Sequence, residues 1–98
     1  MAILFFVILD NENPTISDLP DDITHNTDSE LSTAVVTWTE PTATDNSGSV
    51  TLTSSHNSGD MFSIGITTVT YTATDGASNT VIVMFTVEII GMIIMLFD

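Results

Sequence analysis

The sequence contains no lysine, no arginine and no cysteine. Its 13 aspartate and glutamate residues are therefore not balanced by any fixed positive charge, and the formal net charge is −13. Proteins bind nucleic acid by neutralising phosphates with Lys and Arg, so nucleic-acid binding is excluded, as is attachment to anionic lipid through basic residues. The absence of cysteine leaves the redox compartment undetermined. Such acidity favours solubility, cationic partners or divalent ions held through oxygen.

Long hydrophobic runs and helical periodicity are also absent. No apolar run approaches the roughly 20 residues that span a bilayer, so we expect no membrane span. Short apolar tails occupy residues 1–9 and 91–98, and the first lacks the positive n-region and cleavage site of a secretory signal. The tails are either products of an incorrect gene model, or a degraded signal peptide in front and an extended last strand behind. One domain is expected over residues 10–90.

The clearest pattern is the run TTVTYTATD at residues 67–75. Val69, Tyr71 and Ala73 fall on one face, and threonines occupy the other face, which is typical of a strand with one buried side. A turn-rich cluster at residues 75–79 separates this run from a second alternating run at residues 81–87. The two runs predict a central β-hairpin.

Short strands bounded by turns are expected along the rest of the chain. We predict a strand led by Pro14, an edge strand at residues 23–25, an inward face ending at Trp38, a strand at residues 50–53, and a loop at residues 42–48. The pattern predicts an all-β, antiparallel β-sandwich. The expected structural core includes Trp38, Val69, Tyr71, Val83, Phe85 and Leu19.

Ile82 and Met84 lie on the other face of the second alternating run. They form either a contact surface or part of the core beneath the second sheet, and we expect the core.

Catalysis is not expected. The side chains suited to general base work near neutral pH are His25 and His56, and each lies in sequence typical of a surface histidine. Neither a G-x-S-x-G elbow nor a zinc-binding pattern is present, and the pair Asp21 and Asp22 lies in loop sequence.

Three stretches together carry a family resemblance: NPTISDLPDDIT at residues 13–24, WTEPTATDNSGSVTLTSSHNSGD at residues 38–60, and FSIGITTVTYTATDGASNT at residues 62–80. They resemble the hyalin repeat, or HYR domain, over about residues 10–89. The resemblance implies an immunoglobulin-like sandwich in extracellular, multi-repeat proteins with a role in adhesion or matrix assembly.

One departure from the family concerns Leu19 and Val83, which stand where family members commonly carry cysteine. The resemblance implies that these two side chains face each other across the core, from the first strand and the last. Loss of a disulfide from a small secreted domain typically costs about 2–5 kcal/mol, which two buried aliphatic side chains partly recover.

Three functions stay open. The domain is a structural spacer that contacts other extracellular proteins or neighbouring repeats, a calcium-dependent module that stiffens the junction between repeats, or an accessory domain of a larger extracellular enzyme. No cofactor other than calcium is indicated. Calcium takes six to eight hard oxygen ligands, and the loop and linker oxygens that could supply them belong to Asp10, Glu12, Asn13, Asp45, Asn46 and Asp75. Asp and Asn are also good turn residues, and acidic charge keeps a surface soluble, and we expect this role rather than calcium binding.

Overall fold

The computed structural model describes residues 12–91, which form eight strands and no helix. The strands are β1 (Thr15–Ser17), β2 (Ile23–Asn26), β3 (Thr33–Val35), β4 (Thr42–Thr44), β5 (Val50–Ser54), β6 (Met61–Ser63), β7 (Gly65–Asp75) and β8 (Thr80–Ile90). The all-β class predicted from the sequence is confirmed. Among these residues, no helix has the length and apolar character needed to cross a membrane.

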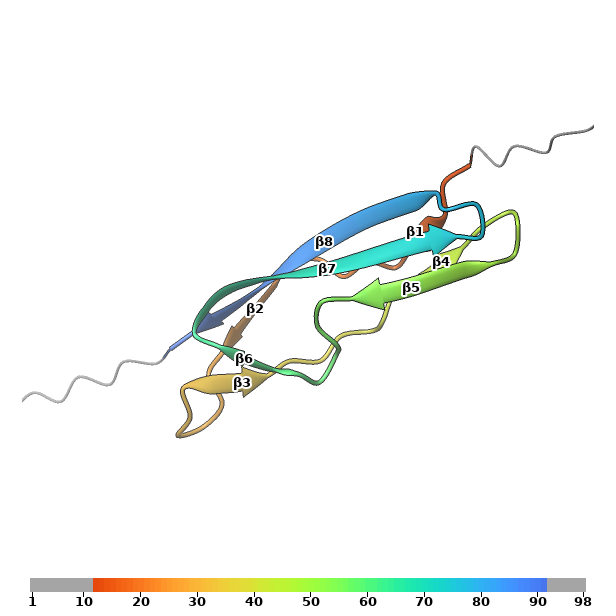
Figure 1. Cartoon of the computed structure of the whole chain (residues 1–98). Helices are drawn as coiled ribbons and strands as arrows, with labels where there is room; N and C mark the ends of the chain where they lie inside the picture. Colours follow the sequence, from red (N-terminus) through yellow and green to blue (C-terminus); the bar gives the residue numbers. More distant parts are fainter. Residues whose placement is uncertain (1–11, 92–98) are drawn as a thin grey trace, which may run out of the picture.

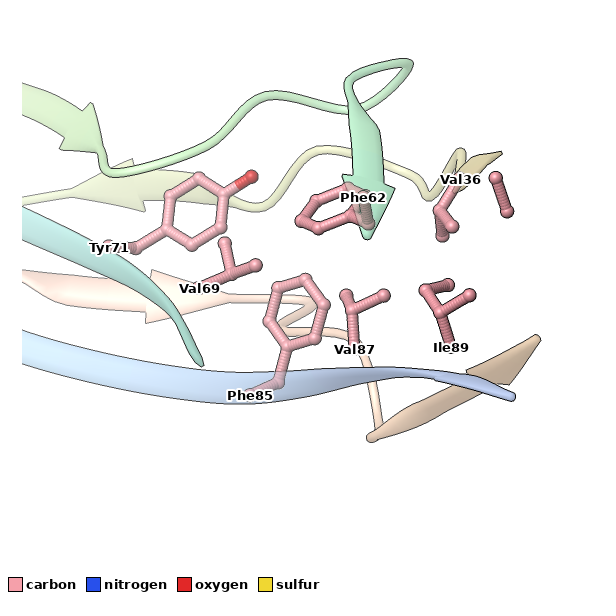
Figure 2. Close-up of a cluster of buried hydrophobic side chains, with 8 residues drawn as sticks. Val36, Phe62, Val69, Tyr71, Phe85, Val87 and Ile89 are labelled. Atoms are coloured by element: carbon pink, nitrogen blue, oxygen red, sulfur yellow. The ribbon is translucent and has the colours of Figure 1, made fainter. Parts of the chain in front are cut away.

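The strands form one larger sheet and two ribbons (Figure 1). The sheet has four strands in the order β2-β8-β7-β5, and the ribbons pair β1 with β4 and β3 with β6. Figure 2 shows side chains of β7 and β8 meeting Val36 and Phe62, which come from the other layer. The core therefore lies between the four-stranded sheet and the chain that runs through β3 and β6, as in a sandwich.

The central hairpin is confirmed as β7 and β8. Val69 pairs with Phe85 and Tyr71 with Val83 in an antiparallel register. Val69, Tyr71 and Ala73 are buried, because alternate residues of a strand face the same side and these three are the apolar ones. The threonines between them point away from the core.

The structure places Tyr71, Phe85 and Val69 in the buried cluster, and Trp38, Leu19 and Val83 half-buried against it. The Trp38 ring meets Phe85 edge-on at a centroid distance of 5.1 Å. Aromatic pairs favour this edge-to-face arrangement, so Trp38 closes the core where the two layers meet.

Two details of the strand arrangement differ from expectation. Residues 42–44 form β4 rather than a loop, and β4 pairs with β1 through Ile16 opposite Ala43. The strand was missed because Thr-Ala-Thr carries almost no apolar signal. Furthermore, β2 runs parallel to β8, so the sandwich is not purely antiparallel. A parallel pair needs a long connection, which the intervening residues 27–79 provide.

The expectation that Ile82 and Met84 belong to the core is wrong. Their side chains are 58% and 56% exposed. Both lie opposite threonines of β7, Thr72 and Thr70, on the side of the sheet that faces away from the core. They therefore belong to a surface.

Candidate functional site

Three segments far apart in sequence meet at one end of the sandwich. We call it the acidic end and define it as residues 12–13, 45–49 and 75–79. Its centre is Asp75, the last residue of β7, which is only 6% exposed.

Asp75 shapes the turn between β7 and β8. Its Oδ1 accepts hydrogen bonds from the backbone amides of Ala77 (2.9 Å) and Asn79 (2.8 Å), and its Oδ2 accepts one from Asn79 Nδ2 (2.9 Å). Aspartate commonly organises turns by accepting bonds from the backbone that follows it. A buried carboxylate needs such donors, so the turn is built around this side chain.

The turn holds the other two segments in place. The Gly76 amide donates to the carbonyl of Ser49 (3.2 Å), which joins the turn to the β4–β5 loop. Asn79 Nδ2 donates to the carbonyl of Glu12 (3.1 Å), which joins the turn to the segment before β1. The structure thus brings Asp45, Asp75 and Glu12 to one end, a grouping that the sequence left open.

Within the described residues, one carboxylate oxygen of Asp45 accepts hydrogen bonds and the other does not. Its Oδ2 accepts from the backbone amide of Ser47 (3.0 Å) and from the Ser47 hydroxyl. Its Oδ1 is buried and has no hydrogen-bond partner within residues 12–91. Gly48 closes the same loop with a φ of 81°, a conformation that glycine adopts without strain.

These residues do not form a complete calcium site among themselves. Asp10 lies outside the described residues, while Glu12, Asn13 and Asn46 are exposed. In the part of the chain that the structure describes, no three His, Cys, Asp or Glu side chains group closely enough to hold a metal ion. Calcium needs six to eight oxygens, so further ligands would have to come from outside residues 12–91.

A second polar arrangement, which sequence reasoning missed, lies beside the core. Trp38 Nε1 donates to the hydroxyl of Tyr71 (2.8 Å), and that hydroxyl donates to a carboxylate oxygen of Glu40. The other Glu40 oxygen accepts from the Ser58 amide (2.8 Å), and the Ser58 hydroxyl accepts from the Trp38 amide (2.7 Å). Buried Trp and Tyr usually find partners for their polar atoms, which is the signal that could have indicated this ring of bonds.

The ring of bonds shifts the acidity of Tyr71. Burial, with the hydrogen bond and the negative charge of Glu40, raises its pKa from 10.0 to about 12. Tyr71 therefore stays protonated at physiological pH and connects β7 to the segment between Trp38 and Glu40.

The two histidines take part in local bonds. His25 Nδ1 lies 2.6 Å from the carbonyl of its neighbour Asn26 on the edge strand β2. His56 Nδ1 lies 2.9 Å from the Ser55 hydroxyl. Ser55 Oγ also accepts from the Thr70 amide (2.9 Å), so this hydroxyl continues the pairing of β5 with β7.

The fold and the acidic end define a small β-sandwich module. Its described chain begins at the acidic end and finishes at the opposite end (Figure 1). The chain belongs to the HYR domain family, whose pattern matches residues 9–89. This confirms the resemblance seen in the sequence.

Individual relatives agree with this assignment. The chain is 39% identical over 85 residues to hyalin of Lytechinus variegatus, covering 86% of this chain and 16% of that protein. It is 44% identical over 72 residues to hyalin of Strongylocentrotus purpuratus, covering 72% of this chain and 6% of that protein.

A third relative is the sushi, von Willebrand factor type A, EGF and pentraxin domain-containing protein 1 of Rattus norvegicus. It is 40% identical over 89 residues, which cover 88% of this chain and 2% of that protein. The chain thus spans a small part of each of these relatives. No solved structure matches the chain significantly.

Proposed function

We propose that the chain acts as a non-catalytic extracellular module that serves as a spacer and protein-interaction surface in an adhesion or matrix protein. The observation that carries this proposal is the HYR match over residues 9–89, in a chain whose alignment covers only 2–16% of the length of these relatives. In these relatives the matched domain is one small part of a longer protein, as in other modular chains.

The path of the chain supports a spacer. Glu12 lies at the acidic end, bound to the β7–β8 turn, whereas β8 ends at the opposite end with Ile90 (Figure 1). A strand of 11 residues extends about 36 Å at 3.3 Å per residue. Neighbouring units attached at the two ends would therefore be held apart by the length of the hairpin.

Fluorescence energy transfer tests the spacer role. Because the chain has no cysteine, Asn13→Cys with Ile90→Cys gives two unique dye positions. We expect one narrow distance distribution centred at roughly 35–40 Å, the length of the hairpin. A matched pair, Asn13→Cys with Ala77→Cys, places both dyes at the acidic end and should give clearly higher transfer. Equal transfer for the two pairs, or a broad distribution for the first, would refute a rigid spacer.

A calcium-dependent junction is the second candidate. It is favoured by the meeting of Glu12, Asp45 and Asp75 at the end where the chain begins its first strand. A neighbouring unit attached there would supply the missing oxygen ligands.

A further inference from the structure

The side of the four-stranded sheet that faces away from the core has an unusual composition. We call the part of this side on β5, β7 and β8 the outer face and define it as positions 51 and 53 of β5, the even positions 66–74 of β7 and the even positions 80–90 of β8; Thr24 and Asn26 of β2 continue it beside Glu88 and Ile90. The strand register places these positions on one side, with Thr74 opposite both Thr51 and Thr80. Eight of the 13 positions are threonine, four are isoleucine or methionine, and one is Glu88.

This face is nearly free of the charge that covers the rest of the molecule. Residues 12–91 contain 11 Asp and Glu, of which ten lie off the outer face. Since the whole sequence has no Lys or Arg, two copies repel each other in most orientations. Contact between outer faces places only one acidic residue of each copy, Glu88, within the contact itself.

The chemistry of the face suits contact with a copy of itself. Ile82 and Met84 are more than half exposed at successive outward positions of β8, beside Thr72 and Thr70. Threonine hydroxyls both donate and accept hydrogen bonds, so a face rich in threonine can satisfy an identical face. A two-fold contact of this kind uses the same patch on both partners.

We propose that the outer face is a homotypic contact site, on which a second copy of this chain packs face to face around Ile82 and Met84. The inference rests on the proposed role as an interaction module and names its partner. A cationic partner would instead be drawn to the acidic loops, because the outer face contributes little to the negative field.

The size of the face sets the strength of the contact. Strands about 4.8 Å apart with a rise of about 3.4 Å per residue give roughly 450 Å² of flat area per copy, or roughly 900 Å² for the pair. Stable interfaces bury about 1,200 Å² or more, so one pair of modules associates weakly. Several modules in a longer protein would strengthen the association through avidity.

Sedimentation equilibrium of the full chain up to millimolar concentration tests this proposal. We expect a reversible dimer that strengthens with added salt, because salt screens repulsion between the acidic copies. Met84→Glu places like charges at the contact and should raise the dimer Kd about tenfold or more. The matched control is Met61→Glu on β6, which is off the outer face and whose native side chain is 66% exposed.

Met61→Glu should leave the Kd unchanged within about twofold, because it adds the same charge at an exposed position outside the proposed contact. Circular dichroism and thermal melting would verify that both variants fold. A chain that stays monomeric at millimolar concentration, a dimer weakened by salt, or equal weakening by the two variants would each overturn the proposal. These results are independent of the dye distances that test the spacer role.

Discussion

At the scale of single residues, Tyr71 serves two functions in the fold. Its ring lies in the core, while its hydroxyl accepts from Trp38 and donates to Glu40. Because burial and Glu40 raise its pKa to about 12, Tyr71 couples folding to protonation at high pH.

Tyr71 makes stability fall at alkaline pH. Above pH 10 the unfolded chain loses the phenolic proton while the folded chain retains it, so the free energy of unfolding decreases until about pH 12. Below pH 10 this stabilisation is fully present. The sequence has no Lys, Arg or Cys and a single Tyr, so no other side chain titrates in this window. Thermal melting across pH 8–12 should show the decline.

Tyr71→Phe should remove that alkaline decline. At neutral pH it should cost about 1–2 kcal/mol, because the Trp38 indole N–H loses its acceptor. Glu40→Gln is the matched control: it should reduce the decline without abolishing it, since burial is the largest cause of the shift. An unchanged alkaline decline in Tyr71→Phe would show that another process is responsible.

The sequence predicts the burial of a residue well where a single periodic pattern determines which side of the strand the residue faces. Val69, Tyr71 and Ala73 follow the alternation of a strand, and all three are buried. Glu40 was not predicted as a partner of Tyr71, because the two residues are 31 positions apart and only the tertiary fold brings them together.

At the scale of elements, long strands were easier to predict than short ones. Both strands of the central hairpin have 11 residues, which gives the alternation several repeats. β4 has three residues, too few for a period to be seen. The parallel pairing of β2 with β8 could not be predicted from the sequence either. Alternation shows which side of a strand is apolar but not which strand lies beside it.

The pairing implied by the family resemblance can be tested with Leu19 and Val83. Leu19 lies just after β1 rather than on it, and both side chains are half-buried against the core. Leu19→Cys with Val83→Cys should oxidise to a monomeric product with a higher Tm, with a gain of about 2–4 kcal/mol over its reduced form. Thiol titration and melting with and without reductant measure this.

The matched control for this pair is Leu19→Cys with Ile82→Cys, because Ile82 points to the outer face. It should keep two free thiols in oxidising buffer. Free thiols in the Leu19 and Val83 variant as well would mean that the family pairing does not hold in this chain.

Calcium binding at the acidic end is a prediction that belongs to the scale of the loops. A single chain should bind calcium weakly, with a Kd on the order of 10⁻⁴–10⁻³ M, and a polypeptide with two copies in tandem should bind it more tightly because the second copy supplies further oxygen ligands. Asp10→Asn with Glu12→Gln should reduce the heat of binding in titration calorimetry. Asp21→Asn, which lies on the β1–β2 connection, is the matched control. Equal heats from all variants would leave the acidic linker as a solvated segment.

At the scale of the whole molecule, we expect that the domain folds without the apolar ends of the sequence. A chain shortened to residues 10–90 should unfold cooperatively and be more soluble than the full chain, because exposed apolar runs promote association. Denaturant titration and solubility measurements check this. Separate removal of residues 1–9 and of residues 91–98 is the control, and loss of folding on removal of residues 1–9 would show that they belong to the domain.

The parallel pairing of β2 with β8 determines how the domain bears mechanical load. Tension applied at residues 12 and 91 pulls these two strands in opposite directions along their axes. Their hydrogen bonds run across the strands, so this tension loads them together in shear. Pulling instead at the paired residues Asn26 and Ile90 would open the same bonds one after another. Single-molecule force measurements should therefore show a higher rupture force for the end-to-end geometry.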